Sequence, residues 1–154
     1  DEDSVRIIRM AAPLHDIGKI GIPDQILMKP GRFDPEEFER MKAHTTIGAS
    51  ILEGTIFPVL KLAGTIALAH HEKWDGSGYP LGLKGEDIPI AARIVAIADF
   101  YDALTHERPY KQAWTPEATI EEMVRQRGAH FDPDVVDAFV RLYESRALDE
   151  MLAV

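Results

Sequence analysis

The segment from Ile90 to Leu104 is apolar almost all round, and this feature constrains the fold more than any other. A helix that is hydrophobic on every face is stable only where other elements cover it on several sides. The rest of the chain lacks the alternation of apolar and polar residues that is typical of half-buried strands. The sequence therefore predicts an all-α domain packed around a central helix at 90–104.

Local signals predict the helices that surround this central segment. Ser4 is a candidate capping residue, and each of Asp34, Thr115 and Asp132 is followed by a proline, as at many helix starts. Residues 72–89 hold four glycines and two prolines, which predicts an ordered loop. The expected helices cover residues 4–15, 34–52, 58–71 and 90–104, followed by one from 115 to about 127 and one that starts at 132.

Composition excludes several classes of protein. The 154 residues fit a single domain, and a hydrophobic share of 45% is enough for a sizeable core. The net charge of −9 argues against a protein that binds nucleic-acid polymers through a basic face, and the absence of cysteine excludes thiolate metal sites and cysteine nucleophiles. No apolar run reaches the roughly 18 residues of a membrane helix, and the acidic start is unlike a signal peptide. We expect a soluble cytoplasmic domain without membrane contact.

Histidines and carboxylates recur next to the expected helix ends. His15-Asp16 follows an apolar helix, and Lys19 lies one turn further on, where its ammonium could contact a phosphate oxygen. The tandem His70-His71 ends another helix. Imidazole and carboxylate ligands suit iron, manganese or zinc. Each residue also has an ordinary alternative, such as a helix cap or a solvated side chain, and His44 on its own carries little information.

Asp99 lies within the apolar central helix, where an isolated carboxylate would need a cation or a hydrogen-bonding partner. In the glycine-rich loop, Tyr79 could stack on a base, or it could anchor the loop to the core. After the central helix, Arg108 and Lys111 flank a Pro-Tyr pair, a pattern suited to holding phosphate unless both cations are simply solvated.

These motifs resemble the HD-GYP subgroup of the HD-domain metal-dependent phosphohydrolases. The matching pieces occur in the family's order and span residues 11 to about 140. The most specific piece is the long second motif, residues 70–80. The complete set is His15-Asp16-Ile17-Gly18-Lys19, His44, residues 70–80, residues 98–105 and Arg108-Pro109-Tyr110-Lys111.

The resemblance implies a helical HD-domain bundle and a bacterial signalling enzyme that hydrolyses cyclic di-GMP to linear pGpG, with GMP as the alternative final product. It implies a centre of two or three divalent metal ions, iron or manganese above all. Two such cations would lower the pKa of a water molecule that they share, so hydroxide would be available at neutral pH. The implied metal ligands are His15, Asp16, His44, His70, His71 and Asp99, with Asp16 as the bridge.

The resemblance also implies how substrate and partner proteins are bound. Lys19 is expected to contact phosphate or metal-bound water and to take part in catalysis together with Asp16. Tyr79, Arg108 and Lys111 are expected to contact the substrate. The segment Gly78-Tyr79-Pro80 is expected to offer a docking surface for GGDEF cyclase domains, and a homodimer remains an alternative to a monomer.

One departure from the family concerns the start of the chain. The family supplies a further His, and in some members a Glu, from a helix well upstream of the His-Asp pair, whereas the 14 residues before His15 contain no His. We therefore expect a single HD-GYP domain over residues 1–154 that is truncated at its N-terminus and excised from a larger multidomain protein. Two other functions stay open. One is a module that binds cyclic di-GMP or a GGDEF domain without hydrolysis, and the other is a phosphohydrolase acting on another cyclic dinucleotide.

Overall fold

The computed structural model describes residues 1–107 and 112–145 of the chain. All regular structure in these two stretches is helical, apart from a single bridge between Arg127 and Phe131, which confirms the predicted all-α class. None of the described helices has the length and apolar character needed to cross a membrane. The α-helices are α1 (Glu2–Ala11), α2 (Asp24–Leu27), α3 (Pro35–Lys42), α4 (His44–Ile51), α5 (Pro58–Ala69), α6 (Ile90–Thr105), α7 (Pro116–Arg125) and α8 (Pro133–Glu144), with 3-10 helices η1 (Ala12–Leu14), η2 (Ile17–Gly21) and η3 (Gly85–Asp87).

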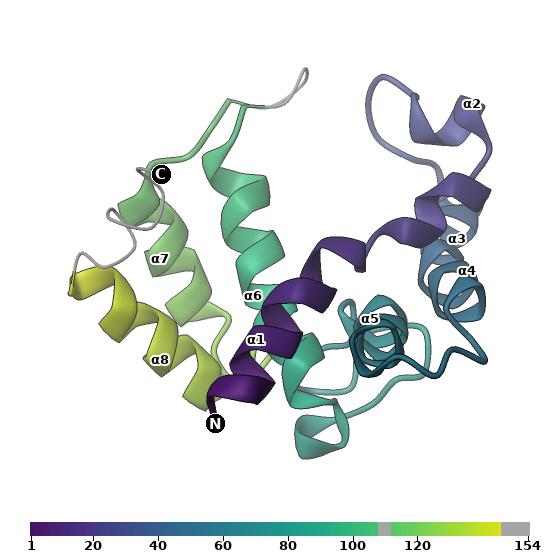
Figure 1. Cartoon of the computed structure of the whole chain (residues 1–154). Coiled ribbons are helices and arrows are strands. Elements are labelled where there is room, and N and C mark those ends of the chain that lie inside the picture. Colours follow the sequence, from purple (N-terminus) through teal and green to yellow (C-terminus); the bar gives the residue numbers. More distant parts are fainter. Residues whose placement is uncertain (108–111, 146–154) are drawn as a thin grey trace.

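Helix α6 lies at the centre of the fold, as its apolar sequence predicts. Figure 1 shows α6 between α7 and α8 on one side and α1 and α5 on the other. Three groups of buried side chains all draw on α6. Val95 packs with α1 and α5, Ile97 packs with α7 and α8, and Ala92 packs beneath the glycine-rich loop. This helix therefore connects the two halves of the domain.

The first helix begins earlier than its sequence predicts. The carboxylate of Asp1 accepts a hydrogen bond from the backbone N–H of Ser4 at 2.7 Å, so Asp1 is the capping residue and Ser4 lies inside the first turn. The helix then tightens to the 3-10 form at residues 12–14, just before His15. Asp1 and Ser4 are both good caps, and the earlier one lets the helix gain a further turn.

The predicted helix over residues 34–52 is in fact two helices. Asp34 and Glu37 form a reciprocal capping box at the start of α3, as the Asp-Pro signal predicts. The chain then bends at Ala43, and α4 begins at His44. No proline or glycine marks this break, which is why the sequence pattern missed it. The bend matters because it brings His44 into the interior.

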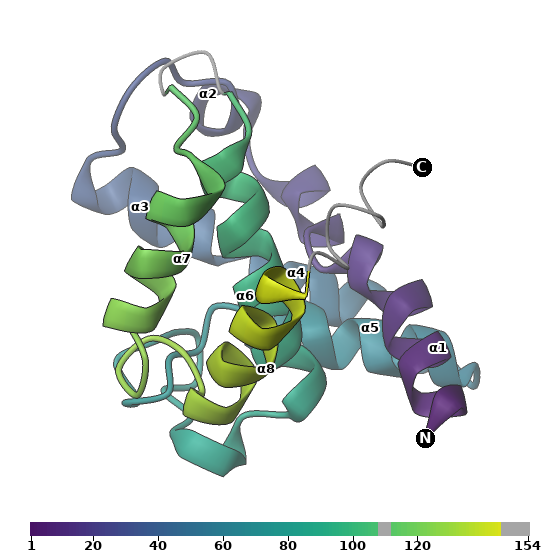
Figure 2. The ribbon, with the colours of Figure 1, turned by 90° about the vertical axis from the view of Figure 1, so that its left-hand side faces the viewer.

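The glycine-rich loop packs against the turn between α7 and α8. The N–H groups of Trp74 and Asp75 donate to the carbonyls of His130 and Ala129 at 3.0 and 2.9 Å. Figure 2 shows the two connections side by side, far apart in the sequence but adjacent in space. The predicted ordered loop is confirmed, with one short 3-10 helix, η3, inside it.

Candidate metal centre

Four separate segments bring the predicted metal-binding side chains to one place. His15 and Asp16 follow η1, His44 is the first residue of α4, His70 and His71 follow α5, and Asp99 lies on α6. One ligand atom from each of Asp16, His44, His70 and His71 lies within 4.8 Å of the others. The rings of His15 and His70 also meet edge to face, with centroids 5.1 Å apart. Residues that are distant in the sequence therefore form one cluster.

Backbone carbonyls orient three of the imidazoles. Nδ1 of His15 lies 2.9 Å from the carbonyl of Ala12, and Nδ1 of His44 lies 2.6 Å from the carbonyl of Met41. Nδ1 of His70 lies 3.0 Å from the carbonyl of Ala67. A carbonyl only accepts hydrogen bonds, so each Nδ1 carries the proton and donates it. In His44 and His70, whose pKa values are lowered, Nε2 is therefore left with its lone pair, the arrangement found in most metal-binding histidines.

Asp16 faces imidazole rings with both of its carboxylate oxygens. Its Oδ1 lies 3.4 Å from Nε2 of His44 and 3.8 Å from Nε2 of His70. Its Oδ2 lies 3.4 Å from Nε2 of His15 and accepts a short hydrogen bond from Lys19. A carboxylate in this position can bridge two cations. The spacing thus fits the bridging role that the family resemblance implies for Asp16.

Three buried atoms at this point have no hydrogen-bond partner: Asp16 Oδ1, His44 Nε2 and His70 Nε2. Buried polar atoms without a partner are costly, and all three are acceptors that point toward one another. A cation between them would satisfy all three together. The oxygen and nitrogen donor set, with no thiolate, suits manganese, iron or zinc, so the residues present fit a divalent metal ion.

Burial keeps the inner imidazoles neutral. Burial, together with the charges of neighbouring histidines, lowers the pKa of His70 to about 4 and that of His71 to about 3. The pKa of His44 is also lowered, chiefly by burial. Metal binding requires the neutral ring, so these three side chains are in the correct protonation state at neutral pH.

The His15 side of the cluster is more strongly anionic. The nearby carboxylates of Asp16 and Asp99 raise the pKa of His15 to about 10. Burial by itself raises the pKa of Asp16, but the contacts with His15 and Lys19 outweigh burial and hold that pKa well below its usual range. Two carboxylates that favour a proton on Nε2 of His15 would equally favour a metal cation there.

Asp99 lies at the edge of the cluster. Its Oδ1 is 3.7 Å from Nε2 of His15, and its side chain is 33% exposed. The sequence predicts a carboxylate enclosed by apolar residues, whereas the actual position is half-buried and faces His15. His44 is more buried than its sequence indicates. Its polar neighbours in the sequence indicate a solvated face, whereas its ring is buried.

Tyr79 covers the cluster from the glycine-rich loop. Its ring stacks on His71 with centroids 4.9 Å apart and an angle of 26° between the planes. Burial raises the pKa of the Tyr79 phenol, and the charges of Asp16 and Asp99 raise it further, so the hydroxyl keeps its proton. Lys19 also contacts the cluster, through Asp16. Arg108 and Lys111 lie outside the described residues.

Glu72 holds this loop in place, a role that the sequence motif did not reveal. Its buried carboxylate accepts hydrogen bonds from the N–H of Leu81 at 2.7 Å and of Leu83 at 3.0 Å. Gly78 packs so closely that a Cβ there would lie 2.3 Å from the backbone nitrogen of Lys73. Only one feature of the sequence could have indicated this role: Glu72 directly follows two candidate metal ligands.

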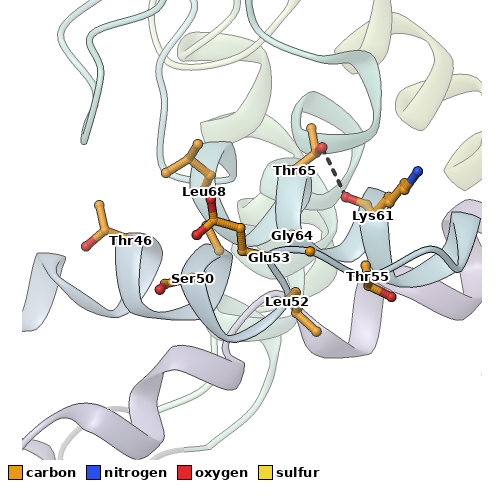
Figure 3. Close-up of a pocket in the computed structure, with 11 residues that line it drawn as sticks. Thr46, Ser50, Leu52, Glu53, Thr55, Lys61, Gly64, Thr65 and Leu68 are labelled. Atoms are coloured by element: carbon orange, nitrogen blue, oxygen red, sulfur yellow. Dashed lines mark hydrogen bonds between the residues drawn. The ribbon is translucent and has the colours of Figure 1, made fainter.

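A surface hollow of about 640 Å³ lies between α4 and α5 (Figure 3). Its rim carries the side chains of Ser50, Glu53 and Thr65, and Thr65 donates a hydrogen bond to the carbonyl of Lys61. None of the clustered histidines or aspartates lines it. We place the candidate site at the cluster, because buried atoms there need a partner, whereas the hollow is open to solvent.

Known proteins match most of this chain. Residues 1–135 match the family model described as HD domain. The chain is 54% identical over 140 residues to the cyclic di-GMP phosphodiesterase response regulator RpfG of Xanthomonas campestris, and 56% identical over 135 residues to a cyclic di-GMP phosphodiesterase of Thermotoga maritima. These matches cover 91% and 88% of this chain but 37% of each relative, so the chain spans little more than a third of their length.

Relatives with another cyclic dinucleotide in their names also match. A 3'3'-cGAMP-specific phosphodiesterase 2 of Vibrio cholerae is 46% identical over 153 residues, which cover 99% of this chain and 28% of the relative. The crystal structure of a cyclic GMP-AMP specific phosphodiesterase from the same organism superposes with a TM-score of 0.65 at 19% identity. The superposition covers 94% of this chain and 39% of that one, and it supports the fold.

Proposed function

We propose, from the premise that this chain belongs to the HD-GYP subgroup of the HD domain family, that it hydrolyses a phosphodiester bond of cyclic di-GMP in a metal-dependent reaction. The observation that carries the proposal is the convergence of Asp16 Oδ1, His44 Nε2 and His70 Nε2, three buried acceptors without a hydrogen-bond partner. Relatives named as cyclic di-GMP phosphodiesterases support this choice of substrate.

The residues fall into two candidate ligand groups that share Asp16. The first is His44, His70, His71 and Asp16 Oδ1, and the second is His15, Asp99 and Asp16 Oδ2. We assign iron or manganese to both groups. When bound, such ions polarise the phosphate and make a water molecule a better nucleophile at neutral pH.

The remaining roles belong to side chains around the cluster. Lys19 already contacts Asp16, so its ammonium is placed to offset charge that develops on a phosphate oxygen. Tyr79, held protonated against His71, would position the substrate with its ring or hydroxyl. We keep Arg108 and Lys111 as further proposed substrate contacts.

A cyclic GMP-AMP dinucleotide is the second candidate substrate. The Vibrio cholerae relative whose name specifies 3'3'-cGAMP matches 99% of this chain at 46% identity. The two substrates differ in one base, so the metal cluster would treat them alike and contacts to the base would decide between them. We rank cyclic di-GMP first because the relatives with higher identity carry that name.

The family likeness is the basis for proposing a partner protein and a location in the cell. We propose a cytoplasmic protein in which the segment Gly78-Tyr79-Pro80 contacts GGDEF domains. Pro80 is exposed in this segment, while Gly78 packs closely against the backbone of Glu72 and Lys73. Co-purification with a GGDEF domain, compared between wild type and Pro80→Ala, tests this contact, and size-exclusion chromatography with light scattering tests for a homodimer.

Product analysis tests the activity. Protein loaded with Mn²⁺ or Fe²⁺ under reducing conditions is expected to convert cyclic di-GMP to pGpG, and His70→Ala is expected to abolish turnover. His106→Ala is the matched control, because His106 is exposed and pairs with Asp102 away from the cluster. Binding of cyclic di-GMP by metal-loaded wild type without any product would contradict hydrolysis and support a non-hydrolytic binding module.

A further inference from the structure

Lys42 presents a cation beside the aromatic side of the candidate centre. It is the last residue of α3, and its Nζ lies 5.3 Å from the ring centroid of Tyr79. Tyr79 stacks in turn on His71. One aromatic ring therefore separates the Lys42 ammonium from a candidate metal ligand, although the sequence motifs gave Lys42 no role.

The ammonium is held in place but remains reachable. Nζ lies 4.8 Å from the ring centroid of Phe38, and the rings of Phe38 and Tyr79 meet edge to face at 6.3 Å. Cation–π contacts with both rings restrict the side chain, which is 26% exposed. A cation that is already positioned and partly desolvated binds an anion better than a mobile surface lysine does.

The existing partner of Lys42 is easy to displace. Its Nζ pairs with Glu39 Oε1 at 2.6 Å, but the Glu39 side chain is 69% exposed. Ion pairs exposed to this degree contribute little to stability, because water competes for both partners. A phosphate oxygen could therefore take the place of the Glu39 carboxylate at small cost.

The charge of the substrate calls for such a cation. A cyclic dinucleotide carries two phosphodiester groups on one ring, so when one of them lies at the metal cluster the other lies a ring width away. The chain has a net charge of −9 and would repel the second group unless a cation stood near it. Lys19 is bound to Asp16 inside the cluster, whereas Lys42 stands outside it, beyond Tyr79.

We propose that Lys42 is a substrate-binding residue that contacts the phosphodiester group not undergoing hydrolysis, with Phe38 and Tyr79 forming the wall that positions its ammonium. This inference rests on the proposed function. Helix α3 would then help the protein to distinguish a cyclic dinucleotide from a substrate with a single phosphodiester.

The test compares two ligands that differ in one phosphodiester group. The probes are a non-hydrolysable phosphorothioate analogue of cyclic di-GMP and linear GpG, both titrated calorimetrically into Mn²⁺-loaded protein at low salt. Lys42→Met keeps the aliphatic stem against the rings and removes the charge. We expect it to weaken binding of the cyclic analogue by about tenfold or more and to weaken binding of GpG far less. Lys42→Arg is expected to restore most of the affinity.

Arg40→Met is the matched control. Arg40 lies on the same helix, pairs with Glu36 at 2.7 Å and is 61% exposed, so the substitution removes the same charge away from Tyr79. We expect it to change neither affinity by more than about twofold, as for an exposed charge. Equal losses for both ligands in Lys42→Met, or equal effects of the two substitutions, would overturn the inference. A wild-type protein that binds the analogue but releases no product from cyclic di-GMP would overturn the proposed hydrolysis alone, and one that binds no analogue would overturn both.

Discussion

Glu72 determines whether Tyr79 stays on His71. Its two carboxylate oxygens accept hydrogen bonds from the N–H groups of Leu81 and Leu83, and its side chain is buried. These hydrogen bonds tie the two ends of the segment from residue 72 to residue 83 together. A single acidic residue thus fixes the loop that covers the candidate centre.

Glu72→Gln is expected to loosen this loop. The amide of glutamine has a single acceptor oxygen, so it can accept from only one of the two backbone N–H groups. Its NH₂ group faces the other N–H, which loses its hydrogen bond. The expected cost is about 1–3 kcal/mol of unfolding free energy. Hydrogen exchange should show that the amides of Leu81 and Leu83 lose protection, while Glu86→Gln, an exposed change in the same loop, leaves them protected. Unchanged exchange in Glu72→Gln would contradict the role of the carboxylate.

His130 makes stability depend on pH outside the metal cluster. Burial lowers its pKa to about 4, its ring stacks on Phe131, and the nearby Lys73 opposes a positive charge. The folded protein therefore keeps His130 neutral between pH 6.5 and 4, where an unfolded chain binds a proton. Stability from this residue is complete above pH 6.5 and is lost as pH falls toward 4.

A His130→Gln variant isolates this effect. In metal-free buffer, the unfolding free energy of wild type is expected to fall more steeply between pH 7 and 4 than that of the variant, by roughly 1–3 kcal/mol in total. Urea denaturation at several pH values gives both curves. Parallel curves would show that His130 titrates alike in the folded and unfolded states.

At the scale of residues, the sequence indicated most of the cluster but not its surroundings. His15, Asp16, His70 and His71 stand in paired motifs, and pairing is visible without a structure. The burial of His44 depends on the bend at Ala43, and the hydrogen bonds of Glu72 depend on loop closure. Both are consequences of tertiary structure, for which the local sequence carries no signal.

Close packing of η2 on α4 brings Asp16 to His44. A Cβ added at Gly18 would lie 1.9 Å from the carbonyl oxygen of His44 and 2.4 Å from the backbone nitrogen of Gly48. Both contacts are with backbone atoms, which cannot rotate away. Glycine at position 18 therefore permits an approach between two elements that any other residue would prevent.

Gly18→Ala is expected to separate these elements, lowering the unfolding free energy by about 2 kcal/mol or more and reducing metal affinity. Gly64→Ala is the matched control on α5, where a Cβ would meet its nearest neighbour at an ordinary 3.5 Å. Since alanine favours a helix by about 1 kcal/mol over glycine, Gly64→Ala should be neutral or stabilising. Thermal unfolding with and without Mn²⁺ measures both effects, and similar behaviour of the two variants would contradict the packing argument.

The predicted helix starts were correct where a capping residue and a proline mark them. Helices α3, α7 and α8 begin where the capping residues Asp34, Thr115 and Asp132 precede a proline, as the sequence predicts. The division between α3 and α4 was missed because no breaker residue marks it. It places Nδ1 of His44 against the carbonyl of Met41, so the break serves the orientation of the ring.

At the scale of the whole molecule, the candidate centre draws its side chains from several packed segments. Its side chains come from the end of η1, the start of α4, the end of α5, and α6, which also packs against α7 and α8. A ligand that binds several elements of the folded state stabilises that state by mass action. The helical fold was predictable, because the motifs of the HD-GYP subgroup occur in the family's order along the chain.

Metal binding is therefore expected to raise the melting temperature. Mn²⁺ at about 100 times its dissociation constant should add about 2.7 kcal/mol of stability, or roughly 5–10 °C for a domain of this size. Asp16→Asn should lose most of this increase, whereas Asp102→Asn, an exposed change beside His106, should keep it. Differential scanning calorimetry with Mn²⁺ and with EDTA gives the comparison, and an equal rise in both variants would contradict a role for Asp16.

The most direct measurement is the number of metal ions bound per chain, obtained by mass spectrometry of protein dialysed against Mn²⁺ or Fe²⁺. Two equivalents are expected in wild type, because one oxygen of Asp16 faces His44 and His70 while the other faces His15. Asp16→Ala is expected to lower the occupancy of both positions, while His106→Ala leaves it unchanged. Wild-type protein that retains no metal, or an Asp16→Ala variant that retains two equivalents, would contradict the account.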